Sequence, residues 1–137
     1  MIVVADAGPL HYLILIDHVE LLRDLYDQVV VPDAVATELS SPSAPTAVRN
    51  WLSGHPAWLS IVTVEGSRVQ EVTDELDFGE RAAIAIAGTL HADLLLMDDA
   101  AGRAEAKRRR LRVTGTLGVL RTAAERGLVN VPETIAR

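Results

Sequence analysis

Short apolar runs alternate with segments of helical periodicity along the whole chain. The runs are rich in valine, isoleucine or leucine and are bounded by polar turn residues, as buried strands are. The predicted strands are 2–5, 28–31, 60–64, 94–97 and 112–114. Helices are expected over 10–26 with a break at Asp17-His18, and over 33–39, 47–52, 77–90, 100–110 and 116–126. This alternation predicts a three-layer α/β/α sandwich with a mostly parallel central sheet.

Length and composition narrow the class of protein. The chain has 137 residues, which suits one domain spanning 1–137. It has no cysteine, so a disulfide framework and a thiolate zinc site are excluded and a reducing compartment is indicated. The first apolar run lacks the basic start of a signal peptide, and no run reaches the roughly 18 apolar residues of a membrane helix. We therefore expect a cytoplasmic protein without a membrane segment.

Acidic residues follow two of the predicted strands directly. Asp6 comes after the first strand and Asp98 after the fourth. Because the carboxyl ends of parallel strands meet at one edge of a sheet, both carboxylates should face the same crevice. Neighbouring carboxylates repel unless a cation neutralises them, and oxygen ligands favour Mg²⁺ or Mn²⁺. Glu38 and Glu80 are the expected additional ligands, with Asp99 in reserve.

Each acid also fits an ordinary structural role. Asp77 and Glu80 have the spacing of a helix capping box. Either Asp98 or Asp99 could cap the helix that follows. Glu38 alone fits a solvated helix residue, and Asp6 alone fits a loop acid. The metal-site hypothesis therefore depends on the whole set.

Four segments resemble the motifs of PIN domains, in the family's order. They are DAGPL (6–10), VPDAVATEL (31–39), DFGERAAIA (77–85) and LLLMDD (94–99). A further segment, VTGTLGVL (113–120), is similar to a prokaryotic PIN-like subfamily. The resemblance covers nearly the whole chain.

The resemblance implies a metal-dependent ribonuclease, often the toxin of a toxin–antitoxin pair. Asp6, Glu38, Glu80 and Asp98 would form its acidic site and would hold Mg²⁺ or Mn²⁺. RNA is the implied substrate, an antitoxin offering a basic side chain is a possible protein partner, and a homodimer is the expected assembly. One position departs from the pattern, because many relatives carry a hydroxyl residue where this chain has Gly8. The departure removes one supporting hydrogen bond of the site.

One cluster of basic residues stands out in a chain whose formal net charge is −6. An acidic surface repels phosphate, so RNA must be met locally or through metal ions. Lys107, Arg108 and Arg109 are candidate RNA contacts, although a cationic helix end favoured by the helix dipole is the alternative. Thr116 precedes free helix N–H groups that could bind a phosphate, and it serves equally well as an N-cap.

Two other functions fit parts of the pattern. A phosphoacceptor receiver domain also places acids at strand ends, but it needs a lysine on a late strand where this chain has Arg112-Val113-Thr114. The second is a PIN-fold binding module that has lost catalysis and acts through partners. Gly8 and the subfamily resemblance keep it open.

Overall fold

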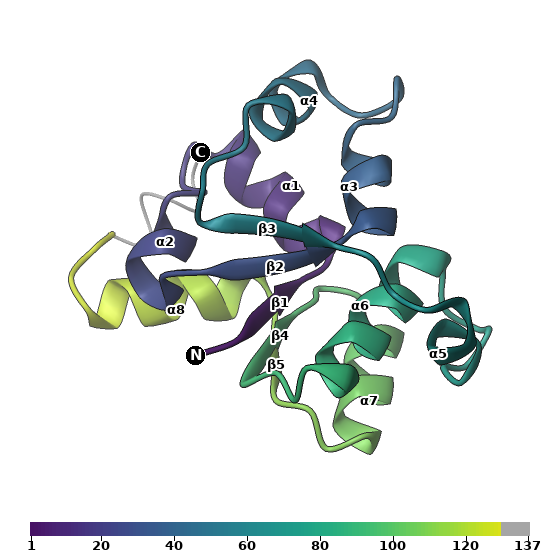
Figure 1. Ribbon diagram of the computed structural model, residues 1–137. Coiled ribbons are helices and arrows are strands. Elements are labelled where there is room, and N and C mark those ends of the chain that lie inside the picture. Colours follow the sequence, from purple (N-terminus) through teal and green to yellow (C-terminus); the bar gives the residue numbers. More distant parts are fainter. Residues whose placement is uncertain (130–137) are drawn as a thin grey trace.

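A computed structural model describes residues 1–129 of the chain, so positions 130–137 of the predicted domain lie outside the described residues. Five parallel strands form one sheet in the order β3-β2-β1-β4-β5 (Figure 1). The strands are β1 (Val3–Ala5), β2 (Val29–Pro32), β3 (Leu59–Val62), β4 (Leu94–Leu96) and β5 (Val113–Thr114). All five predicted strands are present, with ends that differ by one or two residues, and the sheet is parallel throughout.

The central strand β1 is buried on both faces. Val3 and Ala5 belong to one apolar cluster, whereas Val4 belongs to the cluster on the opposite face. Successive side chains of a strand point to opposite faces, so a strand covered on both sides must be apolar at every position. This requirement explains the continuous apolar runs that predicted the strands.

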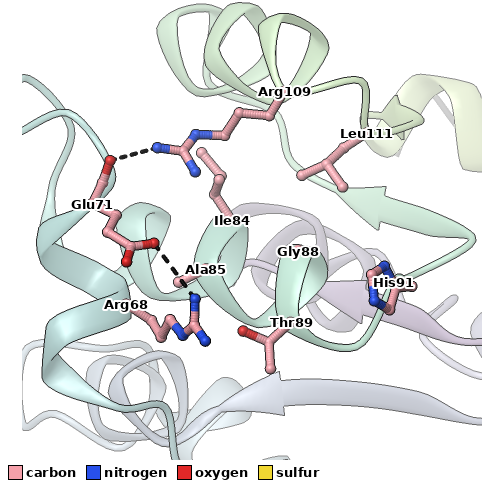
Figure 2. A pocket seen from close by; sticks show the side chains of 9 residues that line it. All are labelled: Arg68, Glu71, Ile84, Ala85, Gly88, Thr89, His91, Arg109 and Leu111. Carbon is pink, nitrogen blue, oxygen red and sulfur yellow. Dashed lines mark hydrogen bonds and ion pairs between the residues drawn. The ribbon is translucent and has the colours of Figure 1, made fainter.

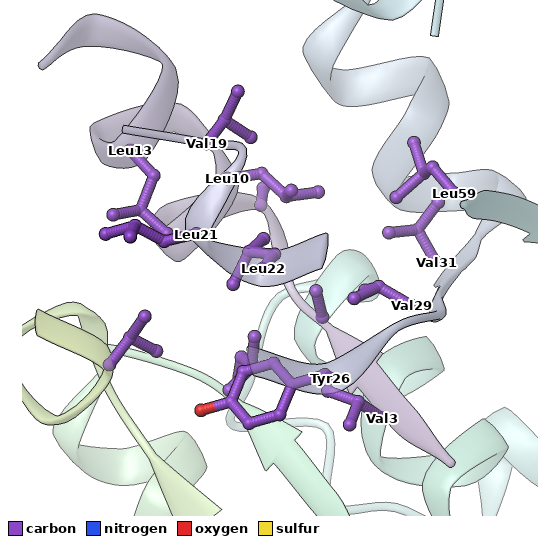
Figure 3. Packing of buried hydrophobic residues seen from close by; sticks show 14 of the residues in the cluster. Val3, Leu10, Leu13, Val19, Leu21, Leu22, Tyr26, Val29, Val31 and Leu59 are labelled. Carbon is purple, nitrogen blue, oxygen red and sulfur yellow. The ribbon is translucent and has the colours of Figure 1, made fainter. Parts of the chain in front are cut away.

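Helices cover both faces of the sheet. One cluster holds residues of α1 (Ala7–Leu15), α2 (Leu21–Tyr26), α3 (Asp33–Leu39), α4 (Thr46–Ser53) and α8 (Thr116–Glu125) (Figure 3). The other cluster holds residues of α5 (Gly66–Gln70), α6 (Phe78–Thr89) and α7 (Ala100–Arg108). The α/β/α fold class is therefore confirmed. The short helix α5 was not predicted.

The predicted break between the first two helices has a clear backbone cause. Asp17 has φ = 62°, a left-handed conformation that ends α1 before α2 begins. At the other end of the chain, Gly127 has φ = 73° and follows α8, as a terminating glycine does. Among residues 1–129, none of the helices combines the length and the apolar composition needed to cross a lipid bilayer.

The two-sided core predicts the effect of truncating a strand residue. Leu96 of β4 is fully buried, so Leu96→Ala should lower the free energy of unfolding by about 2–5 kcal/mol. Leu15→Ala, at a side chain that is 48 % exposed, should change it by no more than about 0.5 kcal/mol. Urea denaturation of both variants measures the difference. Equal losses would contradict the assigned core.

Candidate metal-binding acidic site

Two neighbouring strands bring Asp6 and Asp98 to the same edge of the sheet. In the β1–β4 pair, Ala5 stands opposite Leu96, so the residues that follow them leave the sheet together. The Asp6 N–H donates to the Leu96 carbonyl over 2.9 Å, which fixes the end of β1 against β4. Asp6 is the N-cap residue of α1, yet its side chain makes no capping hydrogen bond. Its carboxylate is therefore not used to cap the helix.

Asp98 is held by the start of α8. Its Oδ1 accepts the Thr116 N–H over 2.6 Å, and its Oδ2 accepts the Thr116 hydroxyl over 2.6 Å. The N-cap of α8 is Gly115, so the alternative in which Thr116 is itself the N-cap is wrong. Asp98 caps α8, whose N-terminal dipole favours a carboxylate.

Two glycines leave room for the Asp98 carboxylate. A Cβ atom on Gly115 would lie 2.5 Å from Asp98 Oδ1, and one on Gly8 would lie 3.3 Å from Oδ2. Gly8 therefore allows α1 to start directly against Asp98. Gly8 has no hydroxyl to offer to Asp98, but Thr116 supplies one from α8.

A second pair of elements contributes the glutamates. Glu38 lies in the last turn of α3, which packs on α6, and a Cβ atom on Gly79 would lie 3.0 Å from its Oε1. At the start of α6, Asp77 Oδ1 accepts the Glu80 N–H over 2.8 Å, and Glu80 Oε1 accepts the Asp77 N–H over 3.1 Å. The capping-box alternative is therefore confirmed.

The pKa shifts show that these acids interact. Burial is the main cause that raises the pKa of Asp6 to about 7, and the negative charges of Asp77, Glu38 and Asp98 also raise it. A hydrogen bond from the Ala7 N–H acts in the opposite direction and lowers it. Asp6 is only 7 % exposed.

The two glutamates are affected in the same direction. Burial, assisted by Asp77, Asp99 and Asp6, raises the pKa of Glu80 to about 7, although the Asp77 N–H opposes the shift. Burial and Asp77 also raise the pKa of Glu38, whereas His11 lowers it. Asp77 thus belongs to the cluster. Sequence reasoning treated it only as a cap, and its spacing to Glu80 was the available signal.

Comparison with known families assigns the chain to one of them. Residues 2–137 match a family described as a PIN domain. The chain belongs to the PIN domain family. A search of curated proteins found no match. PIN domains are generally nucleases, so the match gives this chain a nuclease-type fold.

The donor set of this PIN domain suits a hard divalent ion. Within residues 1–129, no group of three or more His, Asp or Glu side chains is arranged as a ready-made metal site. The clustered side chains nevertheless offer only oxygen ligands, and their mutual repulsion is what a Mg²⁺ or Mn²⁺ ion would relieve. Asp6 and Asp98 would hold such an ion, with Glu38 and Glu80 beside them. Each oxygen of Asp98 accepts one bond from Thr116 and retains a second lone pair.

Asp99 has a structural role in the PIN domain. Its Oδ2 accepts the Gly102 N–H over 2.8 Å, and it is the N-cap of α7. Asp98 therefore caps α8, whereas the adjacent Asp99 caps α7. The metal role assigned to Asp99 in reserve stays a prediction.

The predicted RNA-binding cations are not brought together with the acids. Arg108 and Arg109 both pair with Glu105, at 2.7 and 2.9 Å, and Glu105 is 7 % exposed. These hydrogen bonds lower the pKa of Glu105. The two arginines and Lys107 lie at the C-terminal end of α7, about 13 Å along the helix from its first residue. Their contact with RNA stays a prediction, and pairing of a buried charge is their observed role.

A separate cavity lies at the other end of α6 from Asp77 and Glu80 (Figure 2). It has a volume of about 520 Å³ and includes Gly88 and Thr89. Its two arginines are already engaged, since Arg68 pairs with Glu71 at 3.8 Å and Arg109 also donates to the Glu71 carbonyl. The cavity is therefore distinct from the acidic site.

The raised pKa of Asp6 predicts how stability depends on pH without metal. Between the ordinary pKa of 3.8 and about 7, folded Asp6 binds a proton that the unfolded chain has lost. The free energy of unfolding should therefore fall as pH rises through this window, by about 1–3 kcal/mol between about pH 5 and about pH 8. Asp6→Asn should reduce this fall, measured by urea denaturation in EDTA.

Glu125→Gln is the matched control for this measurement. Glu125 is an exposed acid in the last turn of α8, so its amide variant should keep the pH dependence of the wild type. The assigned burial of Asp6 would be contradicted if Asp6→Asn and wild type lost stability equally over the same window.

Proposed function

We propose that this PIN domain is a metal-dependent endoribonuclease that hydrolyses RNA phosphodiester bonds. The observation that carries the proposal is the convergence of Asp6, Glu38 and Asp98. They come from the ends of β1, α3 and β4, and the pKa of Asp6 responds to both of the others. A buried carboxyl group among like charges destabilises the fold when it loses its proton. A bound cation can offset this cost.

The side chains would divide the work. When bound, Mg²⁺ or Mn²⁺ would lower the pKa of a water molecule and stabilise charge on the phosphodiester. Asp6 would lose its proton as the ion enters, and Thr116 would keep Asp98 in one orientation. Glu80 would act as a general base for the water. Its Oε1 accepts the Asp77 N–H, so Oε2 is free to take a proton from water.

The alternative of an inactive binding module depended on the missing hydroxyl at Gly8 and on the resemblance of residues 113–120 to a PIN-like subfamily; the structure bears on the first of these. Thr116 donates a hydroxyl to Asp98 from another helix, and this observation favours the nuclease. The toxin of a toxin–antitoxin pair is the narrower form of the proposal. The antitoxin would place a basic side chain among the carboxylates. The toxin would act in the cytoplasm as a homodimer.

Cleavage of a mixed panel of single-stranded RNAs tests the proposal. Wild type should cut in Mn²⁺ or Mg²⁺ and stop in EDTA. Asp6→Asn and Asp98→Asn should each lose at least about 100-fold in rate, because ligand loss exceeds the effect of losing a supporting residue. Glu125→Gln should cut like wild type. An inactive wild type, or two fully active Asn variants, would refute the acidic-site mechanism.

The support given by Thr116 can be tested separately. Thr116→Val removes the hydroxyl bond to Asp98 and should lower the cleavage rate by about 10–100-fold. Thr116→Ser keeps a hydroxyl and should retain most of the activity. Rates for both variants over a Mn²⁺ titration give the comparison. If Val and Ser behave alike, the hydroxyl does not position Asp98.

A further inference from the structure

A cavity opens beside the acidic site and shares two of its residues. It has a volume of about 340 Å³ and is formed by α1, the end of α3 and residues 43–45. Gly8 and Glu38 line it, and the helices that form it are adjacent in Figure 1. A group in this cavity would therefore lie next to the reacting phosphate of a bound RNA.

One wall of the cavity is aromatic. His11 and Tyr12 both line it, and their rings meet edge to face, with centroids 5.4 Å apart and planes at 72°. Tyr12 lies one turn after Gly8 on α1. It is 55 % exposed even though most of its ring is apolar and would be expected to be buried. An exposed aromatic ring on the wall of a cavity is a surface on which a flat ligand can stack.

The part of the cavity lined by residues 43–45 is fixed by hydrogen bonds. Ser43 N–H donates to the Ser41 hydroxyl over 3.3 Å, and Ala44 N–H donates to the Ser41 carbonyl over 2.9 Å. Arg49 Nε donates to the Ala44 carbonyl over 3.1 Å. The loop is therefore held from both sides. Ser43 lines the cavity, and its hydroxyl shares a hydrogen bond of 2.9 Å with the Ser41 hydroxyl, which leaves it further capacity to accept a bond from a ligand.

The charge of the cavity selects against phosphate. Its acidic member is Glu38, and the residues among 1–129 that line it include no lysine or arginine. A phosphate group placed there would face a carboxylate without a strong cation, which is unfavourable. A neutral, flat group with hydrogen-bonding edges meets the aromatic wall and the Ser43 hydroxyl without this repulsion.

We propose that this cavity binds one unpaired nucleobase of the RNA, stacked on Tyr12 and adjacent to the scissile phosphate. The inference rests on the proposed ribonuclease function and adds to it a subsite for one base beside the reacting phosphate. A base held in a duplex would have to leave its stack to enter the cavity. The cavity thus also provides a position at which the enzyme can prefer one base over another.

Fluorescence of 2-aminopurine tests the stacking directly. Short single-stranded RNAs carry this base at successive positions and are bound by the Asp98→Asn variant, so that cleavage does not interfere. One position should be quenched on binding, because stacking on an aromatic ring quenches this fluorophore. Adding Tyr12→Ala should remove the quench and weaken binding roughly tenfold, whereas Tyr12→Phe should preserve both. Leu15→Ala, an exposed residue of the same helix, should leave both unchanged.

Cleavage by otherwise wild-type protein provides the second measurement. With wild-type protein, an abasic site at the quenched position of the RNA should lower kcat/KM roughly tenfold. With Tyr12→Ala, whose stacking ring is already gone, the same abasic site should lower kcat/KM little further. Cleavage without any quench, or additive losses from the two changes, would overturn the nucleobase site and leave the nuclease intact. Quenching by a protein that cannot cut would support the base site and refute the proposed function. Thermal unfolding of each variant confirms that the fold is kept.

Discussion

The burial of the Asp6 carboxyl group at the end of the central strand is the constraint on which the site depends. β1 lies between β2 and β4, so the residue after it emerges where helices from both faces converge. Burial and three acidic neighbours raise its pKa to about 7. A protein that keeps this group deprotonated needs a compensating cation, and the surrounding oxygen atoms are the ligands that such a cation prefers.

Helix N-termini organise the acids around Asp6. Asp98 caps α8, Asp99 caps α7, and Asp77 caps α6. Because parallel strands are followed by helices that start at the same edge of the sheet, the capping residues collect there with the strand-end acids. Caps and site acids are therefore overlapping sets. Asp98 is both a cap and a charged neighbour of Asp6, and the bonds that cap α8 also fix the orientation of its carboxylate.

The sequence predicted the fold well because buried parallel strands leave continuous apolar runs, such as Val3-Val4-Ala5. It also placed Asp6 and Asp98 at the sheet edge, since each follows such a run. Some side-chain contacts could not be predicted from the sequence, whether they join distant or nearby positions. The bond from Thr116 to Asp98 spans 18 positions, and the pairing of Arg108 and Arg109 with Glu105 depends on which face of α7 is buried. A five-residue helix such as α5 is too short to show periodicity.

Calorimetric titration with Mn²⁺ at about pH 6, below the raised pKa values of Asp6 and Glu80, tests the central claim most directly. We expect wild type and Glu125→Gln to bind Mn²⁺ with equal affinity and to release protons as they do so, because Asp6 and Glu80 lose theirs. Asp6→Asn should lose most of the affinity and part of the proton release. Binding of the same strength by Asp6→Asn, or no binding by wild type, would contradict a metal site built on Asp6.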